Sequence, residues 1–164
     1  MKVGIISDTH DNLAVVKAAA DIFEERADAV VHCGDVIAPF TVTPFDGDYD
    51  FYVVRGNNDG EWTLQDAVRS FGVYFGEFGQ LSLGGASVAV YHGTSPAIVD
   101  ALVGCGEYDY VFSGHTHQRV HDEIDGTVHL NPGGVPTGSD DEEPPAAVIL
   151  DTETGDVTFH DLPT

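Results

Sequence analysis

The chain has 164 residues, of which 42% are hydrophobic, and its 28 acidic residues against 6 basic ones give it a formal net charge of −22. The length and the hydrophobic content predict one globular domain over residues 1–164, with a core large enough to need no disulfide. The charge excludes non-specific binding to nucleic acid, because the sequence has no basic patch that would displace counterions from phosphates.

The first predicted strand, at residues 3–6, is apolar, rich in β-branched side chains and followed by Asp8 and His10. Alternate residues of an extended chain point the same way, so both side chains can address one point if the extended geometry continues past the strand. A carboxylate and an imidazole suit a transition-metal ion. The alternative is that Asp8 and Asp11 cap the helix that follows.

The next two elements predict a βαβ unit. Apolar residues recur at helical spacing over residues 13–23, with Asp11 or Asn12 as the capping residue, and an apolar strand at 29–31 then runs toward Asp35. A βαβ unit is right-handed and its strands are parallel, so their carboxyl ends lie at one edge of the sheet. We therefore expect Asp35 beside the end of the first strand, at the edge where open α/β sheets bind ligands.

The third predicted strand, at residues 51–54, is followed by a glycine and two asparagines. Gly56 permits a turn that a side chain would hinder, and Asn57 and Asn58 offer neutral oxygen ligands or hydrogen-bond donors. The helical spacing of apolar residues then predicts a helix over residues 61–71.

A hairpin follows in the middle of the chain. After a glycine-rich loop at residues 72–79, alternating apolar residues flank the turn signal Gly84-Gly85, and the second arm ends in His92. Pro96 lies in the first turn of a predicted helix. The hairpin is another strand end that carries a residue of metal-ligand type.

The most specific local signal is the pair His115 and His117, which follows a glycine and a strand at residues 109–112. Taken alone, the pair fits a hydrogen-bonded turn as well as a metal site. It is, however, the fifth strand end that carries Asp, Asn or His, and this repetition favours a metal site.

The last third of the chain predicts antiparallel sheet. Short apolar or alternating runs occupy residues 119–124, 127–130, 146–151 and 157–160. An acidic segment at residues 138–145 separates the middle two runs. We interpret it as a solvated loop, with cation binding or partner binding as the alternative.

Seven residues of metal-ligand type lie at the predicted strand ends: Asp8, His10, Asp35, Asn57, His92, His115 and His117. Seven ligands exceed the needs of one ion and fit two, provided that one carboxylate bridges them. Two ions about 3.5–4 Å apart lower the pKa of a shared water and hold phosphoryl oxygens, which suits in-line attack on a phosphate ester. They also supply local positive charge in an acidic protein.

These motifs, in this order, resemble those of the calcineurin-like metallophosphoesterase superfamily. They are Asp-x-His, Gly-Asp, Gly-Asn-x-Asp, His-Gly and Gly-His-Thr-His, and they extend over nearly the whole chain. The size and the segment Asn131-Pro132-Gly133 are similar to those of the small archaeal and bacterial phosphodiesterase branch. The resemblance implies an α/β (α+β) fold, a four-layer αββα sandwich of two mixed β-sheets flanked by helices.

The resemblance also implies a ligand set. It places Asp8, His10, Asp35 and His117 on one divalent metal and Asp35, Asn57, His92 and His115 on the other, with Asp35 bridging the two. It makes a hydroxide that bridges the two metals the nucleophile. Manganese is the metal expected first, with nickel, iron, cobalt and zinc as alternatives.

One departure from the family pattern is Asn58, which stands where many relatives have a histidine that contacts the substrate and assists the leaving group. An amide can donate a hydrogen bond to a phosphoryl oxygen but cannot deliver a proton. We therefore expect slow turnover of poor leaving groups and a preference for activated esters or diesters. Asp59 is expected to orient the Asn58 loop.

Two more side chains near these motifs have open roles. Arg55 contacts either the phosphate of a substrate or one of the many acidic residues. His32 either hydrogen-bonds a metal ligand or a backbone carbonyl, or belongs to the core.

We predict a metal-dependent phosphodiesterase. A phosphomonoesterase is one alternative, and a non-catalytic protein-binding scaffold, similar to the eukaryotic retromer subunit of this fold, is another. The seven retained ligands favour an enzyme that acts on a small phosphate ester, with no membrane partner. The apolar residues 71–78 belong either to the core or to the interface of a homo-oligomer.

The charge and the cysteines predict where the protein works. A self-repelling surface is best tolerated where salt screens it, so the net charge of −22 predicts a halophilic source. Cys33 and Cys105 show no Cys-x-x-Cys spacing, which favours free thiols in a reducing cytoplasm.

Overall fold

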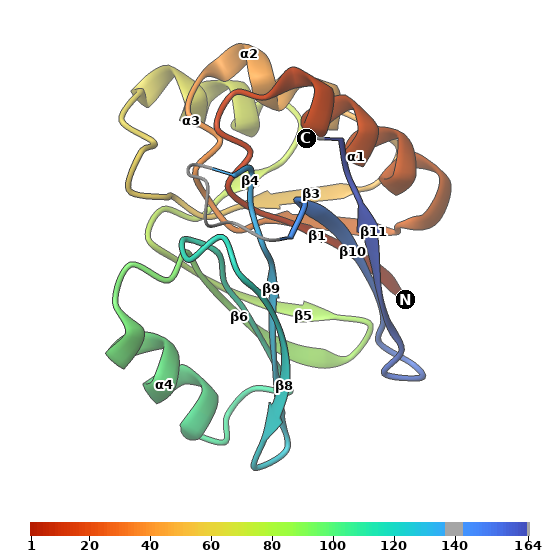
Figure 1. Cartoon of the computed structure of the whole chain (residues 1–164), viewed down its shortest axis with the longest axis vertical. Helices are drawn as coiled ribbons and strands as arrows, with labels where there is room; N and C mark the ends of the chain where they lie inside the picture. Colours follow the sequence, from red (N-terminus) through yellow and green to blue (C-terminus); the bar gives the residue numbers. More distant parts are fainter. Residues whose placement is uncertain (137–142, 164) are drawn as a thin grey trace.

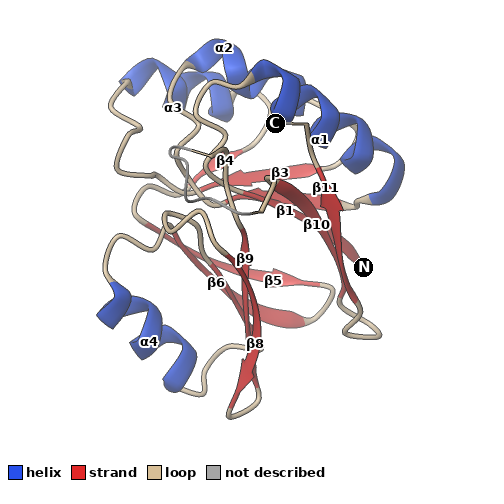
Figure 2. Cartoon of the chain, viewed as in Figure 1, coloured by secondary structure: helices blue, strands red, loops and turns tan. Residues whose placement is uncertain are grey.

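Two β-sheets pack face to face between outer helices in the computed structural model, which describes residues 1–136 and 143–163 (Figures 1 and 2). Within these residues, three helices lie against the outer face of one sheet and a fourth helix lies against the outer face of the other. The layers are therefore helix, sheet, sheet and helix, and the four-layer sandwich is confirmed.

The larger sheet has six strands in the order β11-β10-β1-β2-β3-β4. The strands are β1 (Lys2–Ile6), β2 (Ala29–His32), β3 (Asp50–Val53), β4 (Val73–Tyr74), β10 (Ala146–Asp151) and β11 (Val157–Asp161). The first four run parallel, and β10 is antiparallel to both of its neighbours. The carboxyl ends of β1, β2 and β3 consequently lie at one edge of the sheet.

The smaller sheet has five strands in the order β5-β6-β7-β9-β8. The strands are β5 (Phe78–Leu83), β6 (Ala86–Tyr91), β7 (Tyr110–Phe112), β8 (Arg119–Ile124) and β9 (Thr127–Pro132). The three central strands run parallel, whereas β5 and β8 are antiparallel to their neighbours. Both sheets are therefore mixed, as the resemblance implies.

The helices begin where the sequence supplies a cap or a proline. They are α1 (Leu13–Arg26), α2 (Pro39–Val42), α3 (Trp62–Arg69) and α4 (Pro96–Gly104), and the 3-10 turn η1 is Thr43–Phe45. The side-chain oxygen of Asn12 accepts hydrogen bonds from the backbone N–H groups of Ala14 and Val15, and so caps α1. α2 and α4 each begin with a proline. The first turn of a helix tolerates proline, because a backbone N–H there has no helical partner.

Alternation along the strands separates two apolar cores. In β1, Val3 and Ile5 are buried between the two sheets, whereas Ile6 joins the cluster under the helices that includes Phe23 of α1. Burying a side chain of this size contributes about 1.5–3 kcal/mol relative to leaving it exposed. A one-residue slip would exchange the two faces of the strand, so the two cores fix the register in which each strand pairs.

Hydrogen bonds join the strand ends of the two sheets. His92, which follows β6, donates from Nδ1 to the backbone carbonyl of Cys33, which follows β2, at 2.8 Å. The backbone N–H of His115, which follows β7, donates to Oδ2 of Asp8, which follows β1, also at 2.8 Å. The loops at this shared edge therefore form one connected region.

The structure adds to the sequence predictions in two places. Three short elements, α2, η1 and β4, lie in segments for which the sequence predicts none, because two to four residues are too few to show a hydrophobic period. The last third of the chain forms antiparallel pairs, as predicted, but they lie in different sheets: the β8–β9 hairpin joins the smaller sheet and the β10–β11 hairpin joins the larger one. Pairing within a hairpin joins residues that are close in sequence and is therefore predictable. The strand that each hairpin pairs with is more distant in sequence, so the sheet it joins is not.

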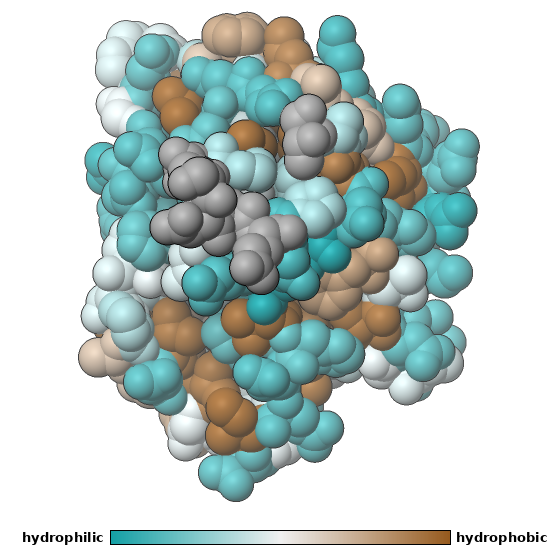
Figure 3. Space-filling view, in the orientation of Figure 1, coloured by the Kyte–Doolittle hydropathy of each residue, from teal (hydrophilic) through white to brown (hydrophobic). Residues whose placement is uncertain are grey.

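The face of the molecule seen in Figure 3 is largely polar, with smaller hydrophobic areas between the polar side chains. Within the described residues, no helix combines the length and the apolar character needed to cross a membrane. Residues 138–142 of the acidic segment lie outside the described residues, so the solvated loop there stays a prediction.

Candidate metal centre

The structure brings the seven predicted ligands together at the shared edge of the two sheets. They come from the loops after β1, β2, β3, β6 and β7. Five of them have a left-handed backbone, namely Asp8 (φ 51°), His10 (φ 42°), Asp35 (φ 58°), His115 (φ 67°) and His117 (φ 57°). Such angles are uncommon for residues with a side chain, and they cluster at functional sites.

This backbone corrects the expected geometry at the first strand. β1 ends at Ile6, and the chain does not continue extended to Asp8 and His10. The two side chains nevertheless converge, with His10 Nε2 lying 3.8 Å from Asp8 Oδ1. Left-handed turns therefore replace the strand alternation that the sequence predicts as the cause of convergence.

The carboxylate of Asp8 lies at the centre of the cluster. Its Oδ2 accepts hydrogen bonds from Ser7 Oγ at 2.5 Å and from the backbone N–H of His115 at 2.8 Å. Its Oδ1 faces Nε2 of His117 at 3.3 Å and Nε2 of His92 at 3.9 Å. Within the described residues, Asp8 Oδ1 and His10 Nε2 are buried without a hydrogen-bond partner. A buried acceptor and a buried imidazole nitrogen that face each other in this way fit a cation between them.

The tautomers of two histidines follow from their carbonyl partners. Nδ1 of His92 bonds to the carbonyl of Cys33 at 2.8 Å, and Nδ1 of His117 bonds to the carbonyl of Val135 at 2.7 Å. A carbonyl only accepts, so each Nδ1 carries the proton. In the neutral ring the Nε2 lone pair therefore faces the carboxylates, as a metal ligand requires.

Asp35 lies between the histidines of the two halves of the cluster. Its Oδ2 is 3.5 Å from Nε2 of His10 and 3.5 Å from Nε2 of His92. Asn58 donates to the same carboxylate twice, from Nδ2 to Oδ2 at 2.7 Å and from its backbone N–H to Oδ1 at 2.8 Å. The position of Asp35 is the one that a bridging ligand needs.

The remaining two predicted ligands lie beside His92. Asn57 Oδ1 is 3.1 Å from His92 Nε2, and the ring centroid of His115 is 5.2 Å from that of His92. In two overlapping groups, the ligand atoms of the described residues lie within 4.8 Å of one another: Asp8, His10 and His117, and Asp8, Asp35 and His92. Asp8 thus belongs to both groups, whereas the resemblance assigns it to one metal.

The charges of the cluster follow from its contacts. Burial raises the pKa of Asp8, but His10 and His117 outweigh it and hold this pKa well below its usual range. For Asp35, burial is likewise outweighed by hydrogen bonding, and its pKa is lowered. Burial lowers the pKa of His92, yet Asp35 and Asp8 raise it above its ordinary value. The two carboxylates therefore stay ionised in a pocket that attracts positive charge.

Asp59 holds both Asp35 and the loop that contains Asn58. Its carboxylate accepts hydrogen bonds from the backbone N–H groups of Asp35 at 2.9 Å, Gly56 at 2.8 Å and Ile37 at 2.7 Å. Burial raises the pKa of Asp59, although the bonds from Gly56 and Ile37 oppose this shift. The carboxylate thus fastens the loop after β2 to the loop after β3, which contains Asn58, in keeping with the expected role of orienting that loop.

Arg55 and His32 have structural partners. Nη1 of Arg55 lies 3.1 Å from Glu77 Oε1, and Nε donates to the carbonyl of Asp59 at 3.1 Å, so an acidic residue is its observed partner. His32 is fully buried, with Nδ1 accepting from Gly34 N–H at 3.2 Å and Nε2 lying 3.1 Å from Thr9 Oγ1. His32 therefore belongs to the core and also holds two of the site loops.

Two glycines are needed for this close approach of loops. A Cβ on Gly56 would overlap Asp35 Oδ1, and a Cβ on Gly114 would overlap Ser7 Oγ and lie 2.5 Å from Asp8 Oδ2. The sequence predicts the first as a turn residue, but no local pattern indicates either contact. The role of Ser7 is not predicted either, since its hydroxyl gives no pattern that sets it apart from a solvated serine.

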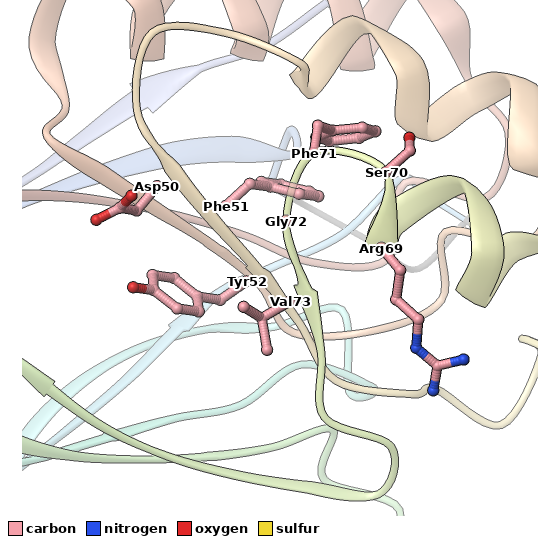
Figure 4. Close-up of a pocket in the computed structure, with 8 residues that line it drawn as sticks. All are labelled: Asp50, Phe51, Tyr52, Arg69, Ser70, Phe71, Gly72 and Val73. Atoms are coloured by element: carbon pink, nitrogen blue, oxygen red, sulfur yellow. The ribbon is translucent and has the colours of Figure 1, made fainter.

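A cavity of about 380 Å³ lies where β3, the end of α3 and β4 meet (Figure 4). Asp50 is the one residue of metal-ligand type in its lining, and it lies at the start of β3, whereas the predicted ligands follow the end of that strand. This cavity is therefore separate from the metal centre. Val73 of the edge strand β4 is 44% exposed, and the self-association of residues 71–78 stays a prediction.

Comparisons with known proteins agree with this geometry. A phosphodiesterase from Methanocaldococcus jannaschii is 34% identical over 161 residues, which cover 93% of this chain and 94% of the relative. A solved structure of an archaeal phosphodiesterase has a TM-score of 0.90 and 32% identity, and the match covers 99% of this chain and 100% of that chain. Vps29 from Chaetomium thermophilum shares the fold alone, with a TM-score of 0.72 and 14% identity over 99% of this chain and 98% of that chain.

A family model covers almost the whole chain. Residues 1–155 match the model described as the calcineurin-like phosphoesterase superfamily domain. The match includes every strand end that carries a predicted ligand, and it agrees with the two mixed sheets and the clustered carboxylates and imidazoles. The chain therefore belongs to the calcineurin-like phosphoesterase superfamily.

Proposed function

We propose that the protein is a metal-dependent phosphodiesterase. The observation that carries this proposal is the pair of ionised carboxylates, Asp8 and Asp35, which face imidazole nitrogens of His10, His92 and His117 at 3.3–3.9 Å. Carboxylate and imidazole ligands suit divalent transition metals, and two such ions suit phosphoryl transfer. The name of the archaeal relative, a phosphodiesterase, supports the same substrate class.

The proposed ligand set follows the family pattern. Asp8, His10, Asp35 and His117 would hold one ion, and Asp35, Asn57, His92 and His115 would hold the other. The buried oxygen and nitrogen without partners, Asp8 Oδ1 and His10 Nε2, support the first site. The equal distances from Asp35 Oδ2 to His10 and His92, 3.5 Å each, support a bridging role. Manganese is the metal that we propose first.

The bound metal ions and the residues of the chain have different roles in the proposed reaction. When bound, divalent ions supply Lewis-acid activation of water and neutralise charge on the phosphoryl oxygens. Asp8 and Asp35 fix where positive charge is held, and the carbonyls of Cys33 and Val135 keep the protons of His92 and His117 on Nδ1. Asn58 holds its amide beside Asp35, where it can donate a hydrogen bond to a phosphoryl oxygen but cannot protonate a leaving group.

The charge of the chain bears on the substrate. A phosphodiester carries one negative charge and a phosphomonoester carries up to two, so an overall charge of −22 repels the diester less. The lack of a proton donor at Asn58 also favours leaving groups that depart without protonation. A small activated diester is therefore the proposed substrate, and a phosphomonoester is the second candidate.

A hydrolysis assay tests the proposal. We expect the metal-free protein, supplied with Mn²⁺ in molar KCl, to hydrolyse bis(p-nitrophenyl) phosphate and to lose this activity when EDTA removes the metal. Asp35→Asn is expected to lower kcat by at least about 100-fold, because a neutral amide bridges two cations poorly. Released p-nitrophenolate is measured by its absorbance.

The assay also separates the enzyme from the scaffold. Circular dichroism controls for the folding of Asp35→Asn, and p-nitrophenyl phosphate compares the monoester with the diester. A folded wild-type protein whose Mn²⁺-dependent rate equals that of Asp35→Asn would rule out the enzyme and favour a protein-binding scaffold.

A further inference from the structure

Asn131 is a buried amide that the proposed chemistry does not use. It lies near the end of β9 and is 1% exposed. Its Nδ2 donates to the carbonyl of Gly114 at 2.9 Å and to Thr116 Oγ1 at 3.1 Å. Its Oδ1 accepts from the backbone N–H of Gly133 at 2.9 Å. One side chain therefore joins two loops that are separate in sequence.

The first of these loops carries His115 and His117. Both residues have left-handed backbones, with φ of 67° and 57°, and such conformations persist only where the surroundings hold them. Asn131 bonds to Gly114 and to Thr116, which are the residues just before each histidine. Its two donors therefore act at the points where the loop must turn.

The second loop orients the imidazole of His117. The carbonyl of Val135 accepts from His117 Nδ1 at 2.7 Å, and the N–H of Val135 donates to the carbonyl of Asp8 at 2.9 Å. Gly133, which Asn131 holds, lies two residues before Val135. The amide thus acts on the backbone of His117 through one loop and on its ring through the other.

We propose that Asn131 is a positioning residue that sets the geometry of the two histidines of the loop after β7 for metal binding. The inference rests on the proposed function for its metal ligands. Residues that hold metal ligands in this way typically change metal affinity by about 10–100-fold when they are replaced. Asn131 itself is not proposed as a ligand of the metal or the substrate.

Two substitutions test the proposal. Asn131→Asp keeps the volume and the acceptor for Gly133 but removes both donors, and Asn131→Ala removes all three bonds. Thr127→Val is the matched control, because Thr127 is also buried in β9 and donates to the carbonyl of Tyr108 at 2.7 Å. It loses a buried hydrogen bond in the same strand at a point remote from the histidine loop.

The first measurement is a titration of each metal-free protein with Co²⁺, followed by visible absorption and by calorimetry. We expect Asn131→Asp and Asn131→Ala to bind Co²⁺ at least about tenfold more weakly than the wild type, with an altered absorption spectrum. Thr127→Val is expected to have a lower Tm but an unchanged Co²⁺ affinity and spectrum. Wild-type affinity and spectrum in a folded Asn131→Asp protein would overturn the proposal.

The second measurement needs no metal. Nuclear magnetic resonance of the metal-free proteins is expected to show shifted amide and imidazole signals of His115 and His117 in Asn131→Asp, and unshifted ones in Thr127→Val. Unshifted signals in Asn131→Asp would overturn the positioning role. A wild-type protein that binds no Co²⁺ would instead overturn the proposed function, so the two failures are distinguishable.

Discussion

Individual residues of the metal centre adopt backbone conformations that are unfavourable in free energy. A residue with a side chain in a sparsely populated backbone region costs about 1–3 kcal/mol, and Asp8, His10 and Asp35 all have such angles. Two hydrogen bonds offset that cost: Ser7 Oγ donates to Asp8, and the backbone N–H of Asp35 donates to the carboxylate of Asp59. The sequence predicts which residues are of ligand type, but their backbone angles depend on these long-range partners and were not predictable.

Asn58 determines which leaving groups the site can handle. We expect Asn58→His to raise kcat for an alkyl phosphodiester by about tenfold or more, because an imidazolium can protonate a poor leaving group. Bis(p-nitrophenyl) phosphate, whose leaving group needs no proton, is expected to change little. Steady-state kinetics with the two substrates measure the ratio of kcat in Asn58→His to kcat in the wild type for each.

Asn58→Ala is the control for this prediction, because Asn58 also donates to both oxygens of Asp35. It removes the side-chain bond without adding an acid, so it is expected to slow both substrates alike. If Asn58→His changed kcat equally for both substrates, this would contradict the claim that the lack of a proton donor at position 58 limits turnover.

His32 makes stability depend on pH. Burial lowers its pKa from 6.5 to about 3, since the ring is inside the core against Phe45. Below about pH 6.5 His32 is protonated in the unfolded chain but stays neutral in the folded one. The contribution of His32 to the free energy of unfolding is therefore complete above that pH and falls as the pH falls. The loss is about 1.4 kcal/mol per pH unit until the folded pKa is reached.

Urea unfolding of the metal-free protein at pH 7, 6 and 5 measures this effect. The variant His32→Phe lacks the titrating group, so its free energy of unfolding is expected to fall less steeply between pH 6 and pH 5 than that of the wild type. Parallel pH profiles for the two proteins would show that His32 does not carry the effect.

At the scale of elements, the loop after β7 must pass close to the end of β1. Gly114→Ala is expected to weaken Mn²⁺ binding by at least about tenfold, because the added Cβ would lie 2.5 Å from Asp8 Oδ2. Gly104→Ala at the end of α4 is the control, since a Cβ there meets nothing within 4 Å. Calorimetric titration with Mn²⁺ compares the two, and equal affinities would contradict the close approach.

The elements differ in how well the sequence predicts them. α1 and the β5–β6 hairpin follow from helical spacing and from the turn signal Gly84-Gly85, and both are confirmed. β4 has two residues and exists through its pairing with β3, which no local pattern reveals. The β10–β11 hairpin is likewise predictable as a hairpin, but its pairing with β1 at the middle of the larger sheet is not.

At the scale of the whole molecule, the predicted convergence depends on how two sheets meet. Parallel order predicts that the ends of β1 and β2 lie together, which accounts for Asp8 and Asp35. Nothing in the sequence fixes the placement of the smaller sheet, so the approach of His92 and His115 to those carboxylates was predicted only from the repeated ligand-type residues at strand ends. The halophilic source, which the charge of −22 predicts, stays a prediction.

The number of metal ions bound per chain tests the central claim most directly. Metal-free protein in molar KCl is titrated with Mn²⁺ in a calorimeter, alongside Asp35→Asn. We predict two equivalents for the wild-type chain and a loss of at least one in the variant, because Asp35 Oδ2 lies 3.5 Å from imidazoles of both halves of the cluster. A single equivalent that persists unchanged in Asp35→Asn would contradict a two-metal centre bridged by this carboxylate.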